Sequence, residues 1–171
     1  MKVDYSNQWF SVLREGKHYF IDEPGSRNGA AMFLVWGEFV VLVEQYRHAI
    51  GKAMIEIPRG YSDPGEESAD CAIRETFEET GFKLSKDEIV FLGSVHPNSG
   101  ILTSKINLYF SRTNQSRPGK NDLSEIDRCI FLPKKDFILR IADNTITDSF
   151  TISAFSMLCS KEDLRKIFYS D

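Results

Sequence analysis

Short apolar runs separated by turn-forming residues fill most of the chain before residue 133, and this pattern predicts β-strands. Within residues 9–22, two β-rich runs flank Glu15-Gly16-Lys17 and indicate a hairpin. The next two apolar runs surround Trp36-Gly37-Glu38, which is typical of buried strands joined by a tight turn. From 106 to 111 apolar and polar residues alternate, so this strand is expected to be half-buried. Strands are expected over 30–35, 39–46, 54–57, 89–95, 106–111 and 129–132.

One internal segment shows the periodicity of a helix instead. From about Ser68 to Thr80 the less polar residues recur at helical spacing, and Gly81 stands where a helix stop belongs. The expected inner face comprises Ala69, Ala72, Ile73, Thr76 and Phe77. The chain from about Lys134 is predicted to be helical, with the last helix starting near Ser160. Strands interrupted by a central helix and followed by helices predict an α/β (α+β) sandwich.

Length, charge and cysteine usage narrow the class of protein. The 171 residues suit a single domain, with 1–28 as an N-terminal β-hairpin extension and 29–171 as the core with its C-terminal helices. A net charge of −4 makes binding to nucleic acid unexpected. The three cysteines lack metal-ligand spacing, and no signal peptide or membrane-spanning run is evident. These features favour a cytoplasmic protein without a membrane partner.

An acidic cluster in the predicted helix carries the candidate chemistry. Glu75, Glu78 and Glu79 are spaced three and four residues apart, so they share one helix face and repel one another. Carboxylates with few basic partners suit a hard cation such as Mg²⁺, although a solvated acidic face is the alternative interpretation. The turn residues 63–65 precede the helix and are able to bring the backbone near Gly60 back toward the carboxylates.

The wider spacing around this cluster resembles the Nudix box, a motif of 23 residues that starts here at Gly60 and ends at Phe82. Thr76 departs from the motif, because an aliphatic residue is usual there. The matching residues are Gly60, Glu66, Arg74, Glu75, Glu78, Glu79, Gly81 and Phe82.

The resemblance implies a Nudix-type α/β/α sandwich with a mixed central sheet, and a hydrolase that uses Mg²⁺ or Mn²⁺. By position, Glu75 and Glu79 match the main metal ligands, and Glu78 matches a further ligand or a catalytic base. The backbone carbonyl of Arg59 matches another metal ligand. The residues expected to brace the loop and helix are Gly60, Glu66, Arg74 and Gly81.

Segments outside the box resemble the ADP-ribose pyrophosphatase branch of this family. Arg47 ends a Glu-Gln-Tyr-Arg run and is either a phosphate or sugar contact or a surface arginine. Glu56 is a candidate metal or substrate contact, with a strand-edge charge as the alternative. Arg59 replaces the commoner alanine of the branch and is a candidate phosphate or base contact. Pro97 is a candidate substrate-loop residue or a plain turn.

Two loops and one C-terminal segment also contain residues with candidate roles. The polar loop 117–127 offers Glu125 as a catalytic base or further ligand, with a solvated loop as the alternative. His96 is expected to serve loop packing, since this chemistry needs no histidine. The segment 144–151 resembles the end of the branch's core and is interpreted as structural.

The expected activity is hydrolysis of a pyrophosphate that links a nucleoside to another group, with ADP-ribose giving AMP and ribose 5-phosphate. Hydrolysis of a GDP-sugar, NADH or a dinucleoside polyphosphate, and a non-catalytic Nudix-fold sensor, are the alternatives. In this branch the N-terminal strands often pack across a homodimer, so a homodimer is expected. An aromatic residue of the extension, Trp9, Phe10 or Tyr19, is then a candidate for stacking on the base.

Overall fold

The computed structural model describes residues 1–116, 118 and 127–170. A mixed sheet of seven strands forms the centre, in the order β10-β5-β4-β9-β8, with β6 paired to β5 and β7 paired to β4. The strands are β1 (Lys2–Ser6), β2 (Ser11–Glu15), β3 (His18–Asp22), β4 (Ala30–Trp36), β5 (Phe39–Arg47), β6 (Lys52–Glu56), β7 (Arg59–Gly60), β8 (Ile89–Val95), β9 (Ile106–Thr113) and β10 (Arg128–Pro133). The helices are α1 (Ser68–Thr80), α2 (Lys134–Ala142), α3 (Ser149–Ser160) and α4 (Glu162–Tyr169), with 3-10 turns η1 (Pro24–Ser26) and η2 (Lys86–Glu88).

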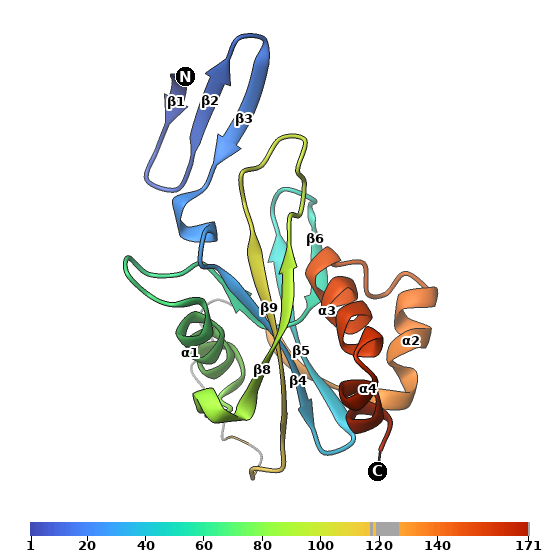
Figure 1. The fold of residues 1–171 in the computed structure, drawn as a ribbon. Coiled ribbons are helices and arrows are strands. Elements are labelled where there is room, and N and C mark those ends of the chain that lie inside the picture. The colour runs from blue at the N-terminus through green and yellow to red at the C-terminus, as the bar shows by residue number, and fades with distance from the viewer. Residues whose placement is uncertain (117, 119–126, 171) are drawn as a thin grey trace.

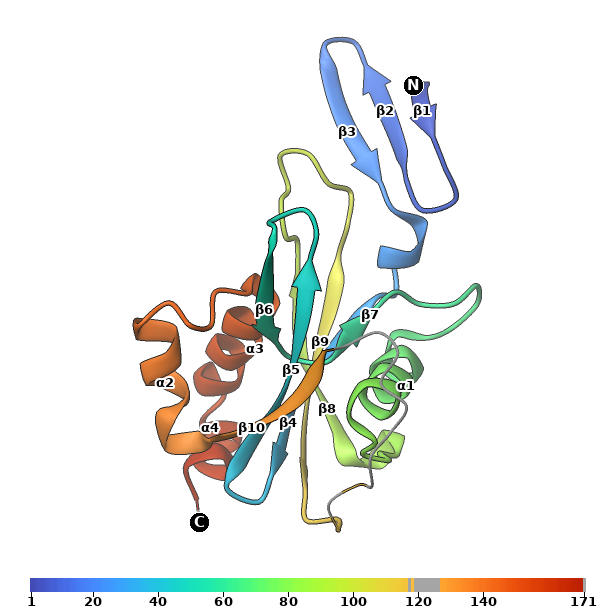
Figure 2. The same ribbon diagram turned by 180° about the vertical axis from the view of Figure 1, so that it is seen from behind.

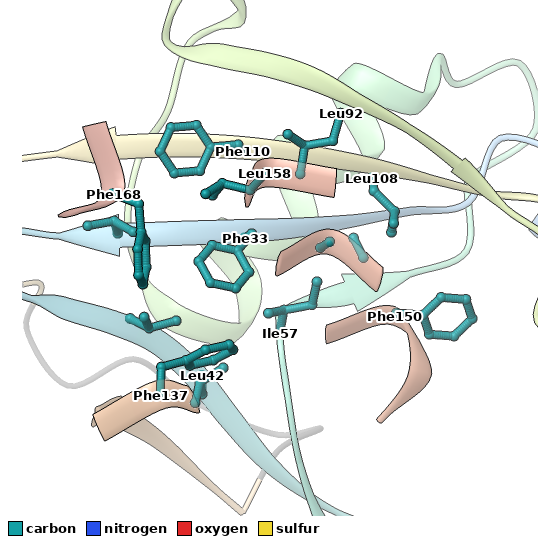
Figure 3. Packing of buried hydrophobic residues seen from close by; sticks show 14 of the residues in the cluster. Phe33, Leu42, Ile57, Leu92, Leu108, Phe110, Phe137, Phe150, Leu158 and Phe168 are labelled. Carbon is teal, nitrogen blue, oxygen red and sulfur yellow. The ribbon is translucent and has the colours of Figure 1, made fainter. Parts of the chain in front are cut away.

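Helices cover both faces of this sheet, as Figures 1 and 2 show. Side chains of β4 alternate between the two faces because strand periodicity is two. Phe33 points toward α2, α3 and α4, where Phe137, Leu158 and Phe168 surround it (Figure 3). Met32 points to the other face and packs with Cys71 of α1. The predicted α/β sandwich is confirmed, with α1 on one side and the C-terminal helices on the other.

The prediction of a half-buried strand at residues 106–111 was wrong. Strand β9 lies between β4, to which it is parallel, and β8, so its polar residues are buried as well as its apolar ones. Each polar side chain has a hydrogen-bond partner that compensates for burial. Asn107 accepts from Ser94, Tyr109 shares a hydrogen bond with Ser68, and Ser111 donates to the Glu88 carbonyl.

The N-terminal extension is a three-stranded antiparallel sheet, where the sequence had predicted a hairpin. The predicted turn is present between β2 and β3, with Gly16 at a φ of +59°. Strand β1 is the third strand, and its five residues are all exposed. The sequence therefore has no pattern of buried apolar residues that would predict this strand. The sheet projects from the core (Figure 2) and joins it where Ile21 exchanges backbone hydrogen bonds with Ile101 and Thr103.

Helix α1 has the predicted bounds, but its buried face differs from the prediction. Phe77 is 41% exposed, and the Lys83 ammonium lies over its ring. Cys71 takes a buried place, and so do Glu75 and Glu79. The last helix, α4, begins at Glu162 and not near Ser160 as predicted. Ser160 is the last residue of α3, where its hydroxyl donates to the Met157 carbonyl. Among the described residues, no helix has the length and apolar character needed to span a membrane.

Candidate active site

Helix α1 places two carboxylates against the short strand β7. Cys71 and Ala72 of α1 pack against side chains of β4, and β7 pairs with β4 at Gly60. The following turns of α1, which carry Glu75 and Glu79, therefore face Gly60. The Glu79 carboxylate accepts a hydrogen bond from the backbone N–H of Arg59 at 3.1 Å. Glu75 lies against Gly60 so closely that a Cβ added there would be 2.0 Å from the Glu75 carboxyl carbon. Glycine is therefore the residue that allows this approach.

The spacing of Glu75, Glu78 and Glu79 had suggested that all three share one environment, but the structure places them in two. Glu75 and Glu79 are 8% and 7% exposed, whereas the side chain of Glu78 is 54% exposed. Glu78 turns instead toward Arg74, which donates to its carboxylate at 3.0 Å. Glu75 and Glu79 therefore form the buried pair, and Glu78 lies at its solvent edge.

Arg74 ties the loop before α1 to the helix. Its Nε and Nη2 atoms donate to the two Glu66 carboxylate oxygens at 2.9 and 2.8 Å, and Nη2 also donates to the Tyr61 carbonyl. Nη1 donates to Glu75 at 2.7 Å. The hydrogen bond from Arg74 is the main cause that lowers the pKa of Glu66, and the Asp63 N–H adds to it. This geometry is consistent with a bracing role for Glu66 and Arg74.

Gly81 ends α1 in a left-handed conformation with a φ of +79°. Its N–H donates to the Phe77 carbonyl at 2.8 Å. A left-handed C-cap favours glycine because a Cβ is disfavoured in this region. The predicted helix stop is thus present in the fold.

A second ionic group lies beside the carboxylates. Glu56, at the end of β6, is only 2% exposed and lies between two arginines. Arg47 donates through Nε and Nη2 at 2.9 and 2.5 Å, and Arg59 donates through Nε at 3.0 Å. Burial opposes ionisation of Glu56, but the hydrogen bonds and charges of both arginines outweigh it and lower the pKa. Glu56 is therefore an ionised, paired carboxylate inside the protein and not a strand-edge charge.

Both groups line one cavity of about 270 Å³. The carboxylates form part of its wall, the arginines another part, and an aromatic ring from the distant helix α3 closes it. Its lining residues are Ala30, Gln45, Arg47, Arg59, Gly60, Tyr61, Glu75, Glu79, Ile106 and Phe150.

A second hollow of about 760 Å³ lies between the N-terminal sheet, η1 and the loop before α1. Trp9 contributes an exposed indole to its lining, and Glu78 borders it. Glu75 and Tyr61 line both hollows, so the two spaces meet at the carboxylates. A molecule with two ends joined by a central anion has room on either side of Glu75.

Some predicted site residues lie elsewhere. Pro97 stands in the turn after β8 and is absent from the lining of both hollows, so the structure does not bring it to the site. His96 lies in the same loop, with Nδ1 at 3.0 Å from the Ser104 carbonyl oxygen, as expected for loop packing. Glu125 lies outside the described residues.

Sequence reasoning did not assign five of the lining residues to the site: Ala30, Gln45, Tyr61, Ile106 and Phe150. Tyr61 directly follows the box glycine, and this adjacency was a usable signal. Its hydroxyl donates to Glu23 at 2.8 Å, and burial, strengthened by this hydrogen bond, raises the pKa of Tyr61 to about 12. Phe150 belongs to the segment interpreted as structural, and no local pattern indicates that α3 reaches the cavity.

The donor set fits a hard divalent cation. Burial raises the pKa of Glu79 to about 8, and the charge of Glu75 adds to this shift, although the Arg59 N–H opposes it. A cation held there would compensate for the buried negative charge. No cluster of three His, Cys, Asp or Glu ligands occurs in the described ranges. The buried carboxylates of Glu75 and Glu79 at β7 are the candidate donors. Mg²⁺ commonly uses one or two carboxylates and completes its shell with water and substrate phosphate.

In EDTA, the unfolding free energy of wild type should fall relative to that of Glu79→Gln as the pH rises from 4.5 to 8. The folded pKa of Glu79 is about 8 against an ordinary value of 4.5, so the fold favours the protonated form. That stabilisation is complete below pH 4.5 and is lost as pH rises through 8. We expect the difference in unfolding free energy to change by roughly 2–4 kcal/mol, measured by urea denaturation at several pH values. A difference independent of pH would contradict the buried state of Glu79.

Comparison with known proteins identifies the family of the chain. The NUDIX domain family model matches residues 25–151. The chain is 31% identical over 128 residues to the methanol dehydrogenase activator of Bacillus methanolicus, covering 74% of this chain and 68% of that protein. It is 31% identical over 109 residues to the ADP-sugar pyrophosphatase of Mus musculus, covering 61% of this chain and 50% of that protein.

A third relative extends over more of the chain. The ADP-ribose pyrophosphatase of Bacillus subtilis is 23% identical over 155 residues, which cover 89% of this chain and 81% of that protein. The family match spans β4 to the start of α3 and thereby includes both carboxylates and both arginines of the cavity. The chain therefore belongs to the Nudix hydrolase family, whose members act on pyrophosphate bonds.

Proposed function

We propose that the protein is a Mg²⁺-dependent hydrolase that cleaves ADP-ribose to AMP and ribose 5-phosphate, with Mn²⁺ as a possible substitute. The observation that carries this proposal is the cavity in which buried carboxylates lie beside two arginines. A pyrophosphate needs cations at several oxygens, and this wall combines a divalent-cation site with fixed guanidinium groups. The names of the mouse and B. subtilis relatives, ADP-sugar and ADP-ribose pyrophosphatase, support this class of substrate.

The roles follow from position. Glu75, Glu79 and the Arg59 carbonyl would hold the cation, which supplies charge neutralisation on phosphate oxygens and activation of the attacking water. Glu78 lies at the solvent edge, where its carboxylate can accept the proton of the water. Glu125 is the other candidate base. Arg47 and Arg59 would orient a phosphoryl group, while Gly60, Glu66, Arg74 and Gly81 maintain the loop and helix geometry.

Hydrolysis of a substrate panel with and without Mg²⁺ tests this function. The panel contains ADP-ribose, GDP-mannose, NADH and diadenosine polyphosphates, with products separated by chromatography. We expect Mg²⁺-dependent release of AMP from ADP-ribose, at a rate above those of the other compounds. Preference for another compound would keep the reaction class and reject ADP-ribose. No hydrolysis by folded, metal-binding protein would reject catalysis and favour a sensor.

We also propose a cytoplasmic homodimer that contacts its partner through the N-terminal sheet. Cys71, Cys129 and Cys159 all lie in the described residues and none of them is in a disulfide, which suits a reducing compartment. Val3, Tyr5 and Tyr19 of this sheet are more than half exposed, and a small sheet needs a covered hydrophobic face for independent stability.

The dimer is tested by charging the face of this sheet on which Tyr5 and Tyr19 both lie. A Tyr5→Asp and Tyr19→Asp double variant should sediment as a monomer, whereas wild type should sediment as a dimer. Ile138→Asp is the matched control, because Ile138 is an exposed apolar residue of α2. A wild-type monomer, or an intact dimer in the double variant, would reject the interface.

A further inference from the structure

Three strand ends bring Glu56, Arg47 and Arg59 together. Arg47 ends β5, Glu56 ends β6, and Arg59 begins β7. The pairing of β5 with β6 places Arg47 opposite Lys52 and leaves its guanidinium to reach the buried carboxylate. The Glu56 carboxylate is thus shared by two arginines that come from different strands.

Each guanidinium is fixed by more than one contact. Arg47 binds the carboxylate through two N–H groups, a geometry that restricts rotation. Arg59 pairs with Glu56 through Nε at 3.0 Å and Nη2 at 2.9 Å, and its Cζ lies 4.9 Å from the centre of the Phe150 ring. Within the described part of the chain, Nη1 of neither arginine makes a hydrogen bond, although both side chains line the cavity.

The charges of this group leave a surplus. Two guanidinium cations and one carboxylate carry a net charge of about +1 next to the carboxylates of α1. Asp148 is also nearby, but burial disfavours its charged form and raises its pKa, against the Thr151 N–H and hydroxyl that donate to it where it caps α3. Each phosphoryl group of a pyrophosphate diester carries about one negative charge, so one phosphoryl group matches the surplus.

We propose that Glu56 is a positioning residue that holds Arg47 and Arg59 as a clamp for the substrate phosphoryl group remote from the cation site. This inference rests on the proposed function and deepens it, because it names the residue that fixes the two arginines of the cavity wall. Glu56 itself contacts neither substrate nor metal. Phe150 keeps the Arg59 guanidinium in place by a cation–π contact.

A double-mutant cycle separates positioning from direct contact. Glu56→Gln, Arg59→Ala and the combined variant are assayed for KM and kcat with ADP-ribose and Mg²⁺, and for affinity toward α,β-methylene ADP-ribose by calorimetry. Each single change should raise KM and weaken the analogue by about 10-fold or more, with kcat within about threefold, since charge-assisted hydrogen bonds are lost. The combined variant should bind no more weakly than the single variant with the larger effect, because the clamp needs both arginines together and Glu56 acts only through them.

Several results would overturn the clamp. Multiplying effects in the double variant would mean that Glu56 affects ligand binding independently of Arg59 and would reject the joint clamp. An unchanged KM in Glu56→Gln would remove the role of Glu56. Arg59→Lys should recover only part of the affinity, because lysine keeps the charge without the planar fork. Full recovery of the affinity in Arg59→Lys would mean that the planar guanidinium is not needed and would reject the clamp. Glu44→Gln is the matched control, since Glu44 pairs with Arg128 away from the cavity and its loss should leave KM unchanged.

Two further measurements keep the inference independent of folding and of substrate identity. If Glu56→Gln does not fold, Arg59→Met retains the apolar stem and should still weaken the analogue by about 10-fold. If wild type hydrolyses no compound of the panel, the proposed function fails, and inorganic pyrophosphate with Mg²⁺ becomes the probe. The Arg59→Met variant should then bind pyrophosphate about 10-fold more weakly, and equal binding would reject the clamp.

Discussion

Glu79→Gln should lower kcat for ADP-ribose by at least about 100-fold, because the amide is a poor ligand for the cation that the reaction needs. The substitution preserves the shape of the side chain, and the amide oxygen can still accept the Arg59 N–H. It also removes a carboxylate whose ionisation burial disfavours. Thermal stability in EDTA should therefore be equal to that of wild type or higher, while the stabilisation that Mg²⁺ confers is lost.

Glu162→Gln is the matched control for this result. Glu162 lies on α4, far along the chain from the site, and forms an exposed ion pair with Lys166. Its substitution should leave both turnover and stability nearly unchanged. Near-normal turnover in Glu79→Gln would show that Glu79 is not a metal ligand. Loss of turnover together with loss of folding in EDTA would assign the residue to the fold.

Gly60→Ala should lower turnover by about 100-fold with a much smaller effect on stability. The added Cβ would stand 2.0 Å from the Glu75 carboxyl carbon, so the carboxylate must leave its place. Because this carboxylate is the end of a flexible side chain, the fold can adjust, at a cost of about 1–3 kcal/mol. The Arg74 hydrogen bond to Glu75 should be lost together with cation binding. Calorimetric titration with Mn²⁺ and steady-state kinetics measure the two effects.

Gly100→Ala provides the comparison. Its added Cβ would meet only the Asn98 side chain, at an ordinary 3.5 Å. Turnover and Mn²⁺ affinity should both stay close to wild type. Wild-type activity in Gly60→Ala would mean that Glu75 functions from another position. A variant that fails to fold would indicate that Gly60 is required by β7 pairing as well.

Much of the fold was predictable because local physics determines it. Helix α1 and strand β8 have the predicted bounds, since periodicity and the Gly81 cap are properties of neighbouring residues. Strand β1 was missed because an exposed strand has no apolar face to detect. The burial of β9 was missed because it depends on which strands lie on either side, and that is a long-range property.

The sequence by itself determined the family, the identity of the box residues and the helix that carries them, since these depend on residue type and spacing. Only the tertiary structure decided which carboxylates are buried, because β7 approaches α1 at Glu75 and Glu79 and leaves Glu78 in solvent. It also joined Glu56 to two arginines and brought Phe150 to the cavity. Distances between strand ends and between a helix and a remote loop depend on packing of the whole chain, so no local pattern encodes them.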